Sequence, residues 1–235
     1  MPRSRPEPDG PRPPRVHARR VLRALVELYP TVTCALEYRD AYELLVATVL
    51  SAQCTDVRVN KVTPALFARF PNPAALAAAD PAAVEEIIHS TGFFRAKARN
   101  LVNLGIALVA HHGGGVPRDL AALTALPGVG RKTAHVVLGN AFALASGIVV
   151  DTHVKRLSFR LGLTRRSDPV QIEHELGALI PRSHWIDFSH RLIAHGRSTC
   201  VAARPRCSLC PLAAICPKQG VLAVDPQASS PPGGG

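Results

Sequence analysis

Four cysteines near the end of the chain have the spacing of a metal site. Cys200, Cys207, Cys210 and Cys216 are separated by six, two and five residues. This spacing allows four thiolates to converge on one centre from a compact loop, and thiolates bind both zinc and iron–sulfur clusters. The spacing alone leaves both metals open. The two other cysteines, Cys34 and Cys54, lie far from this loop and are expected to be small buried apolar residues.

A lysine in the middle of the chain is a candidate nucleophile. Lys132 lies beside Arg131 in the first turn of an expected helix. An amine must lose its proton before it attacks carbon, and the positive end of the helix dipole and the Arg131 charge both favour the neutral amine. The residue alone is not diagnostic, because most lysines of a basic protein are solvated or contact phosphate.

Asp151 precedes another expected helix, whose apolar positions are Val154, Leu157 and Leu161. Aspartate is a favoured residue at the N-cap, so its first expected role is to cap this helix. A carboxylate held by helix amides stays ionised. It can therefore stabilise developing positive charge and help to deprotonate a nucleophile, so the capping and catalytic roles are compatible.

The segment 126–134 has the pattern of a hairpin between two helices. Gly128 and Gly130 permit a tight connection and close approach of the backbone. Free amides at the start of the second helix, together with its dipole, can bind a DNA phosphate without reading sequence. Taken alone, an ordinary glycine-containing helix turn is the better interpretation of this segment.

The elements that must position these residues are expected to be helices. Apolar residues recur at helical spacing around Val21–Leu28, Leu44–Val49, Val84–Ile88 and Leu101–Leu108. Proline and glycine fall between these stretches, and the short apolar run 148–150 is too isolated to seed a sheet. We therefore predict an all-α protein. The ends, residues 1–15 and 221–235, are rich in proline with arginine or small residues and are predicted to be disordered tails.

Composition limits the class of protein and its partners. The chain has 235 residues, and its 47% apolar content is enough to fill a core. Its formal net charge of +11 attracts phosphate backbones or anionic membranes. No apolar run is long enough to span a bilayer, and residues 1–15 lack the apolar core of a signal peptide. We expect a monomeric cytoplasmic protein with no membrane partner.

These motifs together resemble the helix-hairpin-helix DNA glycosylase superfamily, and within it the endonuclease III family. The resemblance rests on residues 50–56, 126–134 and 150–154 and on the cysteine motif, and it extends from about residue 20 to residue 218. It implies that Lys132 and Asp151 are the catalytic pair. It also implies that the four cysteines hold a [4Fe–4S] cluster rather than zinc. The nearby Arg197, Arg204, Arg206 and Lys218 are expected to balance the cluster's charge or to bind phosphate.

The resemblance implies a bifunctional DNA glycosylase and abasic-site lyase of base excision repair. Its partner would be double-stranded DNA with damaged bases or abasic sites, in the bacterial nucleoid, and its substrates would be oxidised pyrimidines. Because the damaged nucleotide must be extruded, Gln53 is expected to fill the gap. Phe93, in the loop facing the opposite strand, either wedges between bases or packs inward. Gly128, Gly130 and Arg131 are expected to contact the DNA backbone.

Two other functions compete with this interpretation. An adenine-mismatch glycosylase needs a catalytic glutamate near residues 45–53, where this chain has no carboxylate. A non-catalytic iron–sulfur DNA-binding module would not need both Lys132 and Asp151. We expect two helical lobes with DNA in the cleft between them. One is a helical barrel, residues 34–146, that includes the hairpin, and the other is a cluster domain of residues 16–33 and 147–220.

Overall fold

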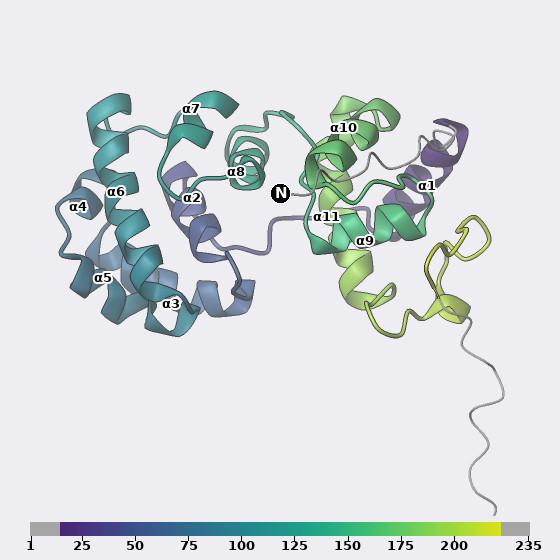
Figure 1. The fold of residues 1–235 in the computed structure, drawn as a ribbon, viewed down its shortest axis with the longest axis horizontal. Helices are drawn as coiled ribbons and strands as arrows, with labels where there is room; N and C mark the ends of the chain where they lie inside the picture. The colour runs from purple at the N-terminus through teal and green to yellow at the C-terminus, as the bar shows by residue number, and fades with distance from the viewer. Residues whose placement is uncertain (1–14, 222–235) are drawn as a thin grey trace, which may run out of the picture.

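The structure, a computed structural model, describes residues 15–221 and is built from helices (Figure 1). Those residues contain no β-strand, so the predicted all-α class is confirmed. The predicted tails lie almost wholly outside the described residues, and Arg15 is already the first residue of α1. The longer helices are α1 (Arg15–Leu28), α2 (Ala41–Leu50), α3 (Asp56–Arg69), α5 (Pro81–Ile88), α6 (Phe94–His112), α8 (Arg131–Phe142), α9 (Thr152–Arg160), α10 (Pro169–Leu179) and α11 (Trp185–Ser198). Short helices are α4 (Pro73–Ala77), α7 (Leu120–Ala125) and the 3-10 turns η1 (His89–Thr91), η2 (Arg182–His184) and η3 (Cys207–Leu209).

The first lobe is built around α2, which is buried from Tyr42 to Leu50. The helix is mostly apolar, with Glu43 and Thr48 as buried polar residues, and α3, α6 and α8 pack around it. Its core takes buried residues from Leu36 through Leu138. The lobe is therefore one continuous stretch of chain. No helix within residues 15–221 is long and apolar enough to cross a membrane.

The second lobe combines the two ends of the described chain. Helix α1 packs against α10 and α11, although more than half of the sequence lies between them (Figure 1). Its buried residues Val21 and Leu25 join a separate core with Phe188, Leu192 and Leu212. The core of one lobe ends at Leu138 and that of the other resumes at Ile148. We propose the lobe boundaries that the sequence indicates, near residue 34 and close to residue 146.

Side-chain caps determine where most helices begin. Seven N-cap residues accept a hydrogen bond from a backbone amide in the first turn of their helix: Asp40, Thr55, Asn72, Asp80, Asp119, Asp151 and Asp168. Such a bond satisfies one of the amides that the helix itself leaves unpaired. The predicted capping role of Asp151 is confirmed by its 2.7 Å bond from the Val154 amide.

Among the described residues, several polar contacts link the two lobes, including one from Arg182 to the Ala145 carbonyl oxygen at 2.9 Å. The Arg197 guanidinium of α11 donates to the Asp56 carboxylate of α3 at 2.6 Å. The His190 ring of α11 lies 2.9 Å from the Asn140 amide oxygen of α8. Arg131 of α8 pairs with a carboxylate of α10, described below. The relative placement of the lobes is thus held by side chains as well as by the connecting chain.

A glycine allows two helices of the first lobe to touch through their backbones. A Cβ atom added at Gly105 of α6 would lie 2.7 Å from the Ala77 amide nitrogen and 2.9 Å from the Pro73 carbonyl oxygen. Gly105→Ala must separate α6 from α4, and we expect it to lower the free energy of unfolding by about 1–3 kcal/mol. Urea denaturation measures this loss.

Asn103→Ala is the matched control, because Asn103 is exposed on the same helix. We expect this control to be nearly neutral, within about 0.5 kcal/mol. If Gly105→Ala were as stable as the wild-type protein, α4 and α6 would not be in backbone contact.

Candidate active site

A solvent-open cavity of about 1190 Å³ lies between the two lobes and contains both residues of the expected catalytic pair. Its walls include Thr48, Ser51, Lys132, Val136 and Asn140 from the first lobe, and Asp151, Ser189, His190, Ile193 and Arg197 from the second. Lys132 begins α8, which packs into the first core, and Asp151 caps α9, which packs into the second. The cavity is therefore the place where the two lobes bring an amine and a carboxylate together.

Lys132 is accessible for reaction. It lies in the first turn of α8, directly after the tight turn at Gly128, whose φ of +75° is the left-handed conformation that glycine adopts readily. A Cβ at Gly128 would also come within 3.2 Å of Asn100. The Lys132 side chain is exposed, and its amine makes no hydrogen bond to any residue within 15–221. The hairpin thus presents a free amine to the cavity.

The carboxylate of Asp151 is only partly used by its capping role. Oδ1 accepts the Val154 amide, whereas Oδ2 has no hydrogen-bond partner in the described part of the chain. Burial lowers the pKa values of the nearby His153 and His190, which favours their neutral forms at neutral pH. Asp151 therefore does not have a permanently charged imidazole as its partner, and one of its oxygens remains available to a substrate or to the lysine.

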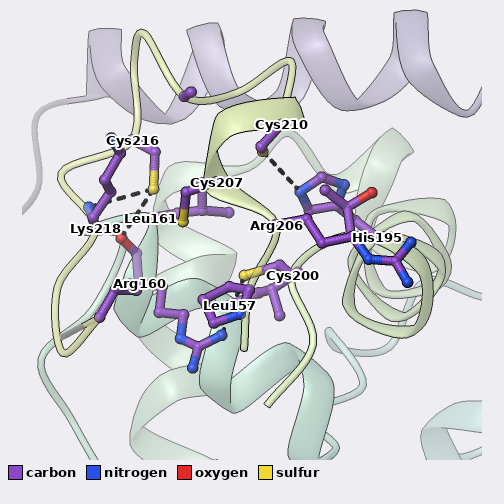
Figure 2. A pocket seen from close by; sticks show the side chains of 14 residues that line it. Leu157, Arg160, Leu161, His195, Cys200, Arg206, Cys207, Cys210, Cys216 and Lys218 are labelled. Atoms are coloured by element: carbon purple, nitrogen blue, oxygen red, sulfur yellow. Dashed lines mark hydrogen bonds between the residues drawn. The ribbon is translucent and has the colours of Figure 1, made fainter. Parts of the chain in front are cut away.

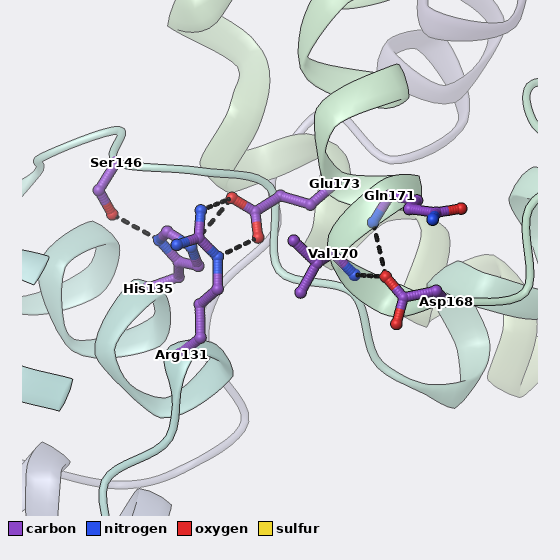
Figure 3. Close-up of polar contacts among 7 residues, drawn as sticks. All are labelled: Arg131, His135, Ser146, Asp168, Val170, Gln171 and Glu173. Atoms are coloured by element: carbon purple, nitrogen blue, oxygen red, sulfur yellow. Dashed lines mark hydrogen bonds and ion pairs between the residues drawn. The ribbon is translucent and has the colours of Figure 1, made fainter. Parts of the chain in front are cut away.

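Arg131 was expected to act on Lys132 as a free positive charge, but in the structure it is paired with a carboxylate. Its guanidinium donates two hydrogen bonds to the Glu173 carboxylate of α10, at 2.7 and 2.8 Å (Figure 3). This pairing neutralises the positive charge that the sequence places next to Lys132 and commits the fork-shaped side chain to a protein carboxylate. Its contact with DNA stays a prediction.

Glu173 is the centre of this contact between the lobes. The His135 Nε2 atom lies 3.1 Å from Oε1, within ion-pair distance but without hydrogen-bond geometry, and the other ring nitrogen contacts Ser146 at 2.7 Å (Figure 3). Burial alone raises the pKa of the Glu173 carboxyl, but His135 and Arg131 outweigh it and lower that pKa to about 2. Sequence reasoning missed Glu173. Its only signal was a glutamate between Ile172 and Leu176 on an otherwise buried helix face.

The two residues expected to enter the DNA lie in exposed loops. Gln53 occupies the turn between α2 and α3 and is exposed, with a φ of +52°. Phe93 immediately precedes α6, is 67% exposed, and has a φ of +48°. The alternative that Phe93 packs inward is therefore wrong. The left-handed conformation is costly for residues other than glycine and recurs at functional loops.

The four clustered cysteines line one cavity of about 410 Å³ in the second lobe (Figure 2). Nitrogen atoms lie against three of their sulfurs. The Arg160 guanidinium is 3.5 Å from the Cys200 sulfur, the His195 ring 3.4 Å from that of Cys210, and the Lys218 amide 3.4 Å from that of Cys216. Contacts of this kind are typical of sulfur atoms that ligate a metal centre.

The donor set of this cavity consists of four thiols. Within the described residues, no three histidine, cysteine or acidic side chains are grouped closely enough to hold one metal ion. The four thiols lie instead around the wall of a shared cavity, as an iron–sulfur cluster requires. Burial raises the pKa values of Cys210 and Cys216, so both are thiols until a bound cation favours their ionised form.

The cations around the cysteine loop differ in part from those expected. Arg206 and Lys218 line the cavity, but Arg197 pairs with Asp56 and Arg204 is not part of the cavity wall. The principal buried cation is Arg160, which also donates to the carbonyl oxygens of residues 201 and 202 at 2.8 and 2.7 Å. Sequence reasoning missed Arg160. Its position beside Leu157 and Leu161 on the buried face of α9 was the available signal.

Comparison with known proteins agrees with this architecture. Residues 46–182 match the family model of the HhH-GPD superfamily of base excision DNA repair proteins. Endonuclease III of Synechocystis is 54% identical over 85% of this chain and 91% of the relative. Endonuclease III of Bacillus subtilis is 44% identical over 81% of this chain and 87% of the relative.

Solved structures give the same result. A trapped endonuclease III–DNA covalent intermediate and a non-covalent endonuclease III–DNA complex each match with a TM-score of 0.83 and 43% identity, over 87% of this chain and 96% of theirs. A thermostable thymine-DNA glycosylase, 21% identical with a TM-score of 0.78, shares the fold. A hairpin lysine and a capping aspartate on either side of one cavity, together with these similarities, show that the chain belongs to the endonuclease III family of the HhH-GPD superfamily.

Proposed function

We propose that this chain is a bifunctional DNA glycosylase and abasic-site lyase of base excision repair, which removes oxidised pyrimidines from double-stranded DNA. The observation that carries the proposal is that Lys132 and Asp151 line the same cavity from opposite lobes. An accessible amine can act as the nucleophile, and a carboxylate with one free oxygen can assist it. The names of the relatives, endonuclease III and its DNA complexes, support the same activity.

Lys132 is the proposed nucleophile for both steps. Its amine attacks C1′ of the extruded nucleotide, the bond from C1′ to the base breaks, and the base leaves with a proton. A second proton then passes from the nitrogen to O4′ as the C1′–O4′ bond breaks, which opens the sugar and leaves an imine between the lysine and C1′. The imine withdraws electrons, so removal of a C2′ proton expels the 3′ phosphate by β-elimination. The Asp151 carboxylate stabilises positive charge on the sugar and accepts a proton from the lysine.

The DNA contacts are proposed to come from backbone amides and exposed loops. Gly128 and Gly130 leave the amides at the start of α8 open to a phosphate, with the helix dipole behind them. Because Arg131 is paired with Glu173, these amides are the stronger candidates for gripping the backbone. Gln53 and Phe93 are proposed to occupy the space left by the extruded nucleotide. We propose that the enzyme acts as a monomer on DNA of the bacterial nucleoid in the cytoplasm.

Cys200, Cys207, Cys210 and Cys216 are proposed to hold a [4Fe–4S] cluster. When bound, the cluster would fold the cysteine loop onto α9 and α11, since metal-binding energy is also folding energy. Arg160 and His195 would orient and partly neutralise the thiolates, because each already contacts a sulfur. These residues act at a distance from the inter-lobe cavity and take no part in the reaction at the sugar.

The adenine-mismatch alternative finds no support in the inter-lobe cavity. The nearest acidic residue to segment 45–53 on α2 is Glu43, which pairs with Arg39 and lines a different cavity with Tyr38 and Phe67. The nucleophile Lys132 is also present at the hairpin. A non-catalytic module is the outcome if DNA binding is found without strand cleavage.

Replacing Lys132 by glutamine tests the nucleophile. Glutamine keeps much of the side-chain bulk but its amide cannot form an imine, so we expect no nicking of abasic-site DNA and no covalent adduct on borohydride reduction. DNA affinity should fall by no more than the loss of about one phosphate contact. Trapping by Lys132→Gln at the wild-type level would place the nucleophile elsewhere.

Asp151→Asn is the companion variant. Asparagine still caps α9, so the protein should melt within a few degrees of wild type and still form the adduct. Loss of the negative charge should slow base excision by about two to four orders of magnitude. A folded Asp151→Asn protein with the wild-type rate would remove the carboxylate from the mechanism.

Gln53→Ala separates extrusion of the base from chemistry at the sugar. We expect slower excision of a paired oxidised pyrimidine and little change in cleavage at a preformed abasic site, because only the first substrate needs a base to be extruded. Single-turnover rates on the two duplexes measure the difference. Phe93→Ala should have a smaller effect of the same kind without loss of stability, since its ring is 67% exposed. Equal slowing on both duplexes would argue against a wedge role.

Metal analysis tests the cluster. The purified protein should contain about four irons per chain and absorb broadly in the blue part of the visible spectrum. Cys207→Ser should lose the colour and unfold at a lower temperature, since a ligand to the cluster is removed. Cys54→Ser is the control, because Cys54 lies in the other lobe. One zinc and no iron per chain would overturn the assignment.

A further inference from the structure

A buried lysine joins the two loops that are proposed to enter the DNA. Lys97 of α6 is 5% exposed, and its ammonium has no part in the inter-lobe cavity. Its Nζ atom donates to the carbonyl oxygen of Leu50 at 2.8 Å and to that of Thr91 at 2.8 Å. Leu50 is the last residue of α2, directly before the Gln53 turn, and Thr91 ends η1, directly before Gly92 and Phe93.

The Lys97 side chain holds the Thr91 end of the Phe93 loop, next to the first backbone hydrogen bond of α6. The Lys97 backbone amide donates to the Phe93 carbonyl oxygen at 3.0 Å, while its side chain holds the Thr91 carbonyl two residues earlier. Gly92 and Phe93 between them have φ values of +70° and +48°. A loop with two successive left-handed residues keeps its shape only where its surroundings fix it. The Lys97 ammonium fixes one end of this loop at Thr91, and the backbone of α6 fixes the other end at Phe93.

On the other side, Lys97 completes the end of α2. The last carbonyls of a helix have no partner within the helix. The amide of Cys54, four residues after Leu50, bonds instead to Ser51, and so leaves the Leu50 carbonyl to the lysine. A cation is favourable at the carbonyl end of a helix. The turn that follows holds Gln53 with a φ of +52°.

We propose that Lys97 is a positioning residue that fixes the distance between the Gln53 and Phe93 loops, so that both side chains enter the DNA as one unit. The inference rests on the proposed role of these two residues and adds the group that couples them. Burial lowers the pKa of Lys97, as expected for a desolvated ammonium. Two charge-assisted hydrogen bonds to carbonyls offset that desolvation. The buried Lys97 ammonium therefore connects the Gln53 and Phe93 loops. Among the described residues, these two loops share no direct hydrogen bond.

Lys97→Met tests the coupling because methionine fills similar space without a donor. In single-turnover assays, we expect excision of a paired oxidised pyrimidine to slow by about tenfold and cleavage of a preformed abasic site to change by less than about threefold. A 2-aminopurine base opposite the lesion should gain less fluorescence on binding, since the gap is filled less well. In the background of Gln53→Ala and Phe93→Ala, Lys97→Met should add little, because coupled residues are not additive.

Gly105→Ala is the matched control, because it destabilises the same helix far from the loops. Its losses should be equal on both duplexes after correction for the folded fraction. If Lys97→Met does not fold, Lys97→Gln takes its place, since its amide retains a donor, and a smaller loss of the same selective kind is expected. Equal slowing on both duplexes, or full additivity with the loop variants, would overturn the proposal. A wild-type protein that neither excises nor nicks would instead overturn the proposed function, and the 2-aminopurine signal would still test the coupling.

Discussion

The ion pair between Arg131 and Glu173 is the contact on which the site geometry most depends. It joins the first turn of α8, which carries Lys132, to α10 of the other lobe, and Glu173 is 8% exposed. Lys132 lies on α8, whose buried residues belong to one hydrophobic core, and Asp151 caps α9, whose buried residues belong to the other, so neither core alone fixes the distance between them. Arg131 is partly exposed but Glu173 is buried, so removal of the arginine would leave a buried carboxylate with one partner fewer. The pair therefore favours one placement of the lobes.

Position 147, next to this ion pair, has no room for a side chain larger than that of glycine. A Cβ atom at Gly147 would lie 2.5 Å from the Glu173 carboxylate and 2.5 Å from the His135 ring. The chain crosses from one lobe to the other at this point, directly over the ion pair. The short segment between the hairpin and Asp151 therefore connects the lobes and also packs against their ion pair. Arg197 and His190 of α11 also bind residues of the first lobe, and so add two further contacts between the lobes.

Much of the fold was predictable because the signals were local. The periodic apolar stretches became α1, α2, α5 and α6, and the aspartate before Val154 became an N-cap. The hairpin was predictable from its glycines, and the shared site of the four cysteines was predictable from their spacing in the sequence. Partners distant in sequence were not: Glu173 lies 42 residues from Arg131, and Arg160 lies 40 from Cys200. Pairings of this kind depend on the tertiary arrangement, so Arg131 and Arg197 were assigned to DNA or the cluster rather than to carboxylates.

The position of α1 has a consequence for the order in which the protein folds during synthesis. The first lobe is contiguous, so its core can close as soon as α8 has left the ribosome. Helix α1 precedes the first lobe in the sequence, but its buried residues Val21 and Leu25 share a core with α9, α10 and α11, which follow that lobe. For most of synthesis the apolar face of α1 therefore has no native partner. The contacts that close this lobe therefore span most of the described chain, and contacts of such high sequence separation carry a larger loop-closure entropy than those of the first lobe.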